Sequence, residues 1–204
     1  ILSVEACEVK GGKIKRFRAP VFIDATGDGW LGYWAGADFR YGREAASQHN
    51  EGWDKYGELW SPKEADNRVM GTSVLWNSER TTQRQDFPAV PWAMPVAGKH
   101  AASKGEWFWE YSDNDLNQID DAETIRDHML RAIFGSFANA KKNPKYAPNR
   151  LKWVAYVGGK RETRRLMGDH IYDMHDAVKR REFPDAVVVE KREVDGHYQR
   201  KLKG

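Results

Sequence analysis

The spacing of apolar residues predicts one long helix in the second half of the chain. Apolar side chains recur every four positions there and so share one helical face: Ile125, Met129, Ile133 and Phe137. The helix predicted from this spacing runs from about Asp121 to Lys141, with Asp120 or Asp121 as its N-cap. It ends before Asn143-Pro144, because proline cannot continue a helix.

At the N-terminus the pattern predicts a β-hairpin. Residues 1–9 and 13–23 are the two strands, and Gly11-Gly12 between them can adopt the positive φ angles of a tight turn. The end of the second strand, Val21-Phe22-Ile23, is continuously apolar, which is typical of a buried strand. It leads directly into the glycine-rich segment 24–29.

The remaining pattern is a mixture of short elements. Short helices are predicted at residues 30–37 and 173–182, and strands at 69–78, 89–98, 106–111, 151–157 and 186–190. The fold class expected from this order is α/β to α+β.

Composition narrows the class of protein. The chain has 204 residues, 40% of them hydrophobic, which is enough for a packed core of one domain or two small ones. A net charge of +3 with both signs interspersed does not favour a nucleic-acid partner, and the absence of a long apolar run does not favour a membrane span. A single cysteine, Cys7, excludes an internal disulfide framework and leaves the compartment undefined. We expect a soluble globular chain.

The segment from Gly27 to Gly32 fits the pattern Gly-x-Gly-x-x-Gly of dinucleotide-binding loops. Three features weigh against that interpretation. Asp28 places a carboxylate where a pyrophosphate would approach, Trp30 is bulky, and no second parallel strand follows within about 30 residues. A turn in which the glycines only supply backbone freedom remains an alternative.

A family resemblance offers a third interpretation. The segment Val21–Gly29 (VFIDATGDG), followed by Ala35-Gly36-Ala37 and Gly42-Arg43-Glu44, resembles the FAD-dependent oxidoreductases with a glutathione-reductase-like flavin domain. In that family an Ala-Thr-Gly-Asp motif ends the last strand of the FAD domain, after a β-meander, and lies close to the cofactor. The resemblance implies FAD as cofactor and Ala25, Thr26, Gly27, Asp28 and Gly29 as the residues that bind it.

The resemblance continues downstream. Residues 158–169 (GGKRETRRLMGD) look like the family's Gly-Lys-Arg-Glu-Ser-Arg-Arg-Leu-x-Gly-Asp segment, and Asp176 and residues 183–186 continue it. The family's N-terminal pyrophosphate loop and its C-terminal flavin segment have no counterpart here. We therefore expect a middle section of a longer protein, one that holds FAD poorly and is inactive by itself.

The resemblance also implies a domain organisation. Residues 1–45 would be the end of an FAD-binding Rossmann-like domain, with the β-meander and last strand. Residues 46–204 would be a mixed-sheet substrate domain with helices, incomplete at its C-terminus. The implied reaction is transfer of a hydride from a small or carbohydrate-like substrate to flavin. The expected partners are that small-molecule substrate and either the remainder of a longer chain or an oligomer partner.

Arginines are candidates for binding an anionic substrate. Arg161 and Arg165 are the proposed substrate residues, because guanidinium groups bind carboxylates and phosphates through paired hydrogen bonds. The alternative is that Glu162 pairs with a neighbouring arginine and fixes this segment to the sheet. The sequence identifies no general base.

Histidines and tryptophans suggest two further kinds of site. One cluster could suggest a metal site: Asp169, His170, Asp173, His175 and Asp176. Its two histidines do not have the spacing of a metal-binding pair, so no metal is predicted. Nine tryptophans raise the alternative of a non-catalytic carbohydrate-binding module with exposed Trp53, Trp60, Trp107 or Trp109. For Trp107 and Trp109, packing against the helix of residues 121–141 is the favoured interpretation.

Overall fold

The computed structural model describes residues 1–51, 62–105, 109–111 and 115–191. Its described strands are β1 Val4–Cys7, β2 Ile14–Phe17, β3 Phe39–Tyr41, β4 Trp76–Arg80, β5 Asn149–Val154 and β6 Arg164–Leu166. Its helices are α1 Trp30–Trp34, α2 Met94–Ala97, α3 Ala122–Lys141 and α4 Met174–Lys179, with short 3-10 helices at Ala46–Gln48 and Pro144–Tyr146.

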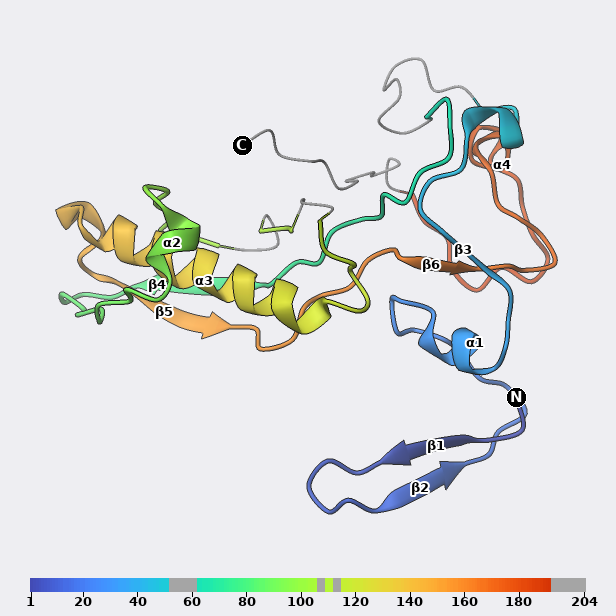
Figure 1. The fold of residues 1–204 in the computed structure, drawn as a ribbon, viewed down its shortest axis with the longest axis horizontal. Coiled ribbons are helices and arrows are strands. Elements are labelled where there is room, and N and C mark those ends of the chain that lie inside the picture. The colour runs from blue at the N-terminus through green and yellow to red at the C-terminus, as the bar shows by residue number, and fades with distance from the viewer. Residues whose placement is uncertain (52–61, 106–108, 112–114, 192–204) are drawn as a thin grey trace.

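The elements form two lobes and a hairpin (Figure 1). One lobe contains α2, α3, β4 and β5, and the other contains α1, β3, β6 and α4. The strands of the described residues pair antiparallel in three two-stranded sheets, β1–β2, β3–β6 and β4–β5. This mixture of small sheets and helices is α+β, as the pattern of short elements predicts.

The core lies between α3 and the β4–β5 sheet. All four residues of the predicted stripe are at most 3% exposed, and they pack with Val74, Trp76 and Tyr111. The helix spans Ala122–Lys141, so both its position and its buried face are confirmed. The side chain of Asn143 then accepts a hydrogen bond from Lys145 N, which begins the following 3-10 turn.

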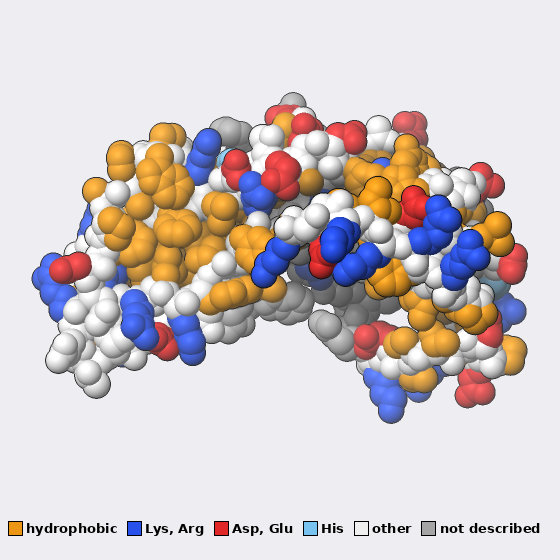
Figure 2. Space-filling view, turned by 90° about the horizontal axis from the view of Figure 1, so that it is seen from below, with side chains coloured by type: hydrophobic (Ala, Val, Ile, Leu, Met, Phe, Trp, Pro, Cys, Tyr) orange, Lys and Arg blue, Asp and Glu red, His pale blue; other side chains and the backbone are white. Residues whose placement is uncertain are grey.

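One face of the β4–β5 sheet is covered by α3, and its outer side carries apolar side chains. Leu75 and Trp153 are 39% and 51% exposed. Figure 2 shows hydrophobic side chains gathered over this end of the molecule. None of the described helices is long and apolar enough to cross a membrane.

Several predicted strands are absent. Residues 21–23 form no strand, and Val21 and Ile23 are largely exposed, so the prediction of a buried strand there is wrong. Pro20 supplies no N–H to a ladder, and within the described residues no neighbouring strand pairs with this segment. The hairpin is confirmed, with shorter strands than expected, but its described residues do not extend into a third strand.

Two other strand predictions are also wrong. Residues 89–98 contain helix α2, which has Pro95 in its first turn, where a missing N–H costs nothing. Residues 186–190 form no strand, and their three valines are exposed. Apolar runs this short do not distinguish a strand from a turn or a helix without knowledge of their partners.

The tryptophan hypothesis can be tested at one position. Trp53, Trp60 and Trp107 lie outside the described residues. Trp109 is half-buried, and its ring centroid lies 6.1 Å from that of Trp76 in an edge-to-face contact. Trp109 therefore packs against the core that includes α3, as the packing interpretation predicts.

Candidate functional site

The segment 24–29, here called the glycine loop, is organised by Asp24. The Asp24 carboxylate accepts hydrogen bonds from Thr26 N at 3.1 Å, Thr26 Oγ1 at 2.8 Å and Gly32 N at 3.0 Å. Thr26 Oγ1 in turn accepts one from Trp30 N at 2.9 Å, at the start of α1. Burial acts to raise the pKa of Asp24, but these hydrogen bonds outweigh it and place the pKa below its ordinary value.

The three glycines of the loop pattern face the segment 160–166. A Cβ on Gly27 would lie 2.8 Å from Lys160 Cβ, and one on Gly29 would lie 3.3 Å from the Arg164 carbonyl oxygen. A Cβ on Gly32 would lie 2.4 Å from a methyl of Leu166. Gly27 and Gly29 also have φ angles of 81° and 65°, which side-chain-bearing residues rarely adopt. The pattern therefore serves close packing within the chain.

The side chain of Asp28 points into the protein. It is 3% exposed, and its Oδ1 accepts a hydrogen bond of 2.8 Å from Thr163 Oγ1. Its Oδ2 lies 3.4 Å from Lys160 Nζ. Thr163 is itself only 1% exposed. The two segments that the resemblance singled out are thus joined by a buried, charged hydrogen-bonding group.

These contacts continue into the other lobe. Lys160 Nζ also donates to the carbonyl oxygen of Gln118, which precedes α3. The side-chain oxygen of the fully buried Gln118 accepts from Thr72 N at 2.9 Å and from Thr72 Oγ1 at 2.6 Å. We call these five residues, Asp28, Thr163, Lys160, Gln118 and Thr72, the polar junction. It connects the glycine loop with the lobe that contains the core.

The Arg164 guanidinium packs against aromatic rings beside the glycine loop. Its guanidinium carbon lies 4.3 Å from the ring centroid of Trp30 and 4.1 Å from that of Tyr33. Arg164 Nη1 also donates to the Asp28 carbonyl oxygen at 3.2 Å. The cation thus links α1, the glycine loop and β6, by contacts that include cation–π attraction.

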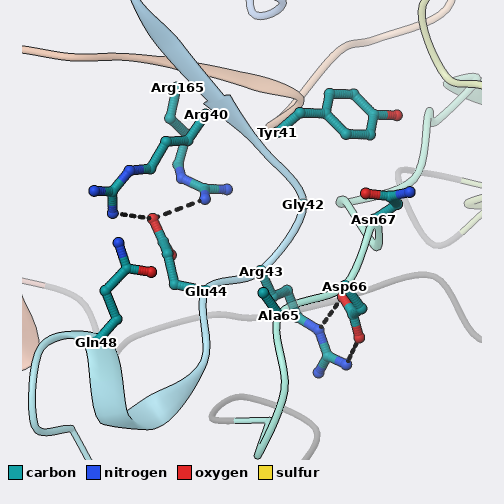
Figure 3. A pocket seen from close by; sticks show the side chains of 10 residues that line it. All are labelled: Arg40, Tyr41, Gly42, Arg43, Glu44, Gln48, Ala65, Asp66, Asn67 and Arg165. Carbon is teal, nitrogen blue, oxygen red and sulfur yellow. Dashed lines mark hydrogen bonds and ion pairs between the residues drawn. The ribbon is translucent and has the colours of Figure 1, made fainter.

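The opposite face of the β3–β6 ribbon has a different chemistry. Arg40 and Arg165 lie opposite one another in the register, and alternation places both on the face away from Arg164. Both side chains contact Glu44 Oε1 (Figure 3). Arg165 Nη2 lies 3.1 Å from this oxygen, and Arg40 Nη1 lies 3.3 Å from it. Arg165 Nη1 also donates to Glu162 Oε1 at 2.6 Å.

These side chains line a small cavity of about 260 Å³. Its lining residues are Arg40, Tyr41, Gly42, Arg43, Glu44, Gln48, Ala65, Asp66, Asn67 and Arg165. On its far side Arg43 forms a two-pronged pair with Asp66, one arm of which measures 3.0 Å from Nε to Oδ1. The cavity lining is polar, and its arginines form ion pairs with its acidic side chains.

The pairs shift the titration of the cavity's charged groups. Burial acts to raise the pKa of Glu44, but the charge and hydrogen bonds of Arg165, with help from Arg40, bring it below the ordinary value. Burial acts to lower the pKa of Arg165, and Glu162 and Glu44 outweigh it and raise that pKa. Both groups are charged at neutral pH, so the cavity presents fixed charges to any ligand.

A family model described as FAD dependent oxidoreductase matches residues 1–203. The chain belongs to this family. No curated protein and no solved structure matches it. The cofactor of this oxidoreductase is therefore FAD, and the protein is a flavoprotein that acts on a small-molecule substrate.

The exposed part of the glycine loop suits a cofactor of this kind. Ala25, Thr26 and Gly27 are exposed, whereas Asp28 and Gly29 are buried. Within the part of the chain that the structure describes, the main-chain N–H groups of Ala25 and Gly27 have no hydrogen-bond partner. They can donate to oxygens of the ribityl or phosphate groups of FAD. The exposed part of the loop thus carries main-chain donors that its internal hydrogen bonds do not use.

The structure separates the two predicted substrate arginines. Arg161 Nη1 lies 3.4 Å from Glu110 Oε2, toward the lobe of the core, whereas Arg165 faces the cavity beside Glu44. The alternative pairing of Glu162 with an arginine is observed, at Arg165. The two guanidinium groups therefore belong to different ion pairs.

The histidine cluster contains one close pair. His170 Nε2 lies 2.6 Å from Asp176 Oδ2, and His175 Nε2 lies 3.1 Å from the Asn50 carbonyl oxygen. The hydrogen bond to His170 contributes most to a pKa of Asp176 below its ordinary value. Among the described residues, no group of three histidine, cysteine or acidic side chains could hold a metal ion.

Sequence reasoning missed four members of the polar junction. Lys160 and Thr163 lie inside the segment that carries the resemblance, but the candidate binding groups there are its arginines, with Glu162 as a pairing partner. No sequence pattern marks Gln118 or Thr72 as a site residue, because a lone glutamine or threonine matches no motif. Their role depends on a contact between residues 46 positions apart.

Proposed function

We propose that this flavoprotein transfers a hydride from a small or carbohydrate-like substrate to FAD. Membership of the family supports the oxidoreductase chemistry, and the exposed loop with unpaired main-chain donors supports the place of the cofactor. When bound, FAD supplies the electron-accepting ring system, and the protein supplies orientation and electrostatics. The observation that carries the proposal is the exposed glycine loop beside a fixed network of charged side chains.

In this proposal the glycine loop binds FAD through Ala25–Gly29. Ala25, Thr26 and Gly27 contact it, and Asp28 and Gly29 contribute from inside the loop. Arg161 and Arg165 bind the substrate, whose hydroxyl or carboxylate oxygens accept from their guanidinium groups. The cavity supports Arg165 in this role, because Gln48 and Asn67 add amides that can bind hydroxyl groups.

We also propose the organisation implied by the resemblance. Residues 1–45 contribute to a glutathione-reductase-like FAD domain, and residues 46–204 to a substrate domain. The β3–β6 pair and the polar junction connect the two parts, since Asp28 and β3 precede the boundary and Thr163 and β6 follow it. In this proposal the substrate lies between the two parts.

The loop's role can be tested with a charge placed on its surface. Ala25→Glu adds a carboxylate to an exposed position of the complete flavoprotein and should repel the FAD phosphates. We expect its FAD dissociation constant to rise about tenfold or more, as measured by titrating apoprotein with FAD. The matched control is Ala37→Glu, which adds the same charge at an exposed position after α1 and should leave FAD binding unchanged. Equal affinities of Ala25→Glu and wild type would refute the assignment of the loop.

The substrate proposal needs a separate measurement. Anaerobic mixing with a panel of sugars and hydroxy acids should bleach the visible flavin absorbance for one class of compound. Arg165→Gln should raise the concentration needed for half-maximal bleaching, because one substrate contact is removed. Bleaching at unchanged concentrations in Arg165→Gln and Arg161→Gln would argue against both arginines as substrate residues.

A further inference from the structure

We infer that Thr163 is a positioning residue for the FAD-binding surface of the glycine loop, and that it acts through Asp28. The inference deepens the proposed function and rests on it, because it takes the exposed part of the loop as the surface that contacts FAD. Thr163 itself is 1% exposed and cannot contact the cofactor from its place behind the loop.

The first argument is the direction of the Asp28 side chain. Its carboxylate is buried, and both oxygens are directed to groups inside the protein, Thr163 Oγ1 at 2.8 Å and Lys160 Nζ at 3.4 Å. A buried carboxylate needs such partners, since burying a charge without them is costly. Asp28 therefore fixes the loop from within, while Ala25, Thr26 and Gly27 form its outer surface.

The second argument is that the loop lacks support from a preceding strand. Residues 21–23 form no strand, so the loop is not fixed by a β-ladder on its N-terminal side. Asp24 and Thr26 hold the loop to α1, and the segment 160–166 packs against Gly27, Gly29 and Gly32. The Thr163–Asp28 hydrogen bond is the shortest of three side-chain contacts from this segment to Asp28, beside those of Lys160 at 3.4 Å and Arg164 at 3.2 Å.

The third argument is the connection to the other lobe. Lys160 contacts both Asp28 and the Gln118 carbonyl, and Gln118 accepts two hydrogen bonds from Thr72. The position of the loop is thereby coupled to the lobe that contains the core. Removing the Thr163 hydroxyl would leave one Asp28 oxygen without its donor and free the loop to change conformation.

The experiment compares two substitutions of Thr163 in the complete flavoprotein. Thr163→Val keeps the shape and removes the hydroxyl, whereas Thr163→Ser keeps the hydroxyl. Titration of apoprotein with FAD should show a dissociation constant about tenfold higher for Thr163→Val and within about twofold of wild type for Thr163→Ser. Should Thr163→Val not fold, Lys160→Met provides the second test, and its dissociation constant should rise similarly.

The control separates a positioning role from general stability. Thr81 Oγ1 donates to the Pro148 carbonyl at 2.9 Å at the far end of the β4–β5 sheet, so Thr81→Val also removes a structural hydroxyl. Thr81→Val should lower stability without changing FAD affinity. An unchanged affinity in Thr163→Val, or an equal loss in Thr81→Val, would overturn the inference. If Ala25→Glu weakens binding and Thr163→Val does not, only the positioning inference fails; if neither does, the proposed role of the loop fails.

Discussion

Thr163 donates a hydrogen bond of 2.8 Å to Asp28, a residue 135 positions earlier in the chain. The pair joins the two sequence segments that most resemble the FAD-dependent oxidoreductases. The Asp28 carboxylate also lies 3.4 Å from Lys160 Nζ, and the side chain of Asp28 is 5% exposed. The contact is therefore a buried ion pair. Removing one partner of such a pair costs more free energy of unfolding than removing one partner of a surface pair.

Asp28→Ala should destabilise the fold by about 3 kcal/mol, because it removes the acceptor of the buried Thr163 hydroxyl and the counter-charge of Lys160. Asp28→Asn keeps one oxygen for Thr163 and should cost less. Urea denaturation of both variants measures the free energies of unfolding. A loss below about 0.5 kcal/mol for Asp28→Ala, the range of ordinary surface substitutions, would contradict the structural role.

Arg164 provides a second test of the same region. Lysine has no planar group to stack on Trp30 and Tyr33, so Arg164→Lys should cost about 1 kcal/mol of stability. It should also change the near-ultraviolet circular dichroism of these rings. The matched control is Arg150→Lys, in an exposed ion pair with Glu79, which should change stability by less than about 0.5 kcal/mol. Equal effects of the two variants would argue against a stacking contribution.

How far the sequence predicts this structure depends on whether a feature is local. The period of four from Ile125 to Phe137 predicts α3 and its buried face, since a 20-residue helix carries its own pattern. The apolar run at 21–23 has no such internal check, and a strand there requires a partner that a sequence pattern cannot supply.

In the candidate site, too, local features can be predicted from the sequence and contacts between distant residues cannot. The residues of the glycine loop follow from a motif, but the direction of Asp28 does not, because its partners are Thr163 and Lys160 from distant positions. Similarly, the sequence singles out Arg165 as a candidate for binding substrate, whereas its pairing with Glu44 depends on the register of β3 against β6.

Gly135 tests the packing of α2 against α3. Alanine is favoured over glycine inside a helix by about 1 kcal/mol. However, a Cβ at Gly135 would lie 2.4 Å from Ala97 Cβ and 2.9 Å from the Ala93 carbonyl oxygen. Overpacking of this kind costs about 1–3 kcal/mol, and more where backbone must move. We therefore expect Gly135→Ala to be destabilising overall.

A double variant identifies the cause of that loss. Ala97→Gly removes the nearer of the two contacts, so Gly135→Ala combined with Ala97→Gly should lose less than the sum of the single variants. Thermal and urea unfolding of the four proteins gives the coupling energy. Strict additivity would show that the two positions do not contact each other.

Glu44 should make the stability of the fold depend on pH. Arg165 and Arg40 hold the pKa of Glu44 below its ordinary value of 4.5 despite burial. A depressed pKa in the folded state contributes stability that is fully present above the ordinary pKa and is lost as the pH falls through the depressed value. Glu44→Gln should therefore be less stable than wild type at pH 7, and the difference should shrink as the pH falls below about 4.5.

Urea unfolding of both proteins across this range measures the difference directly. The pKa values of Asp66 and Asp176 are also lowered, so these groups also lose their contribution to stability at low pH. This loss occurs in both proteins and therefore cancels in the comparison. A constant difference between wild type and Glu44→Gln at all pH values would mean that Glu44 contributes through packing and that its charge adds nothing to the stability.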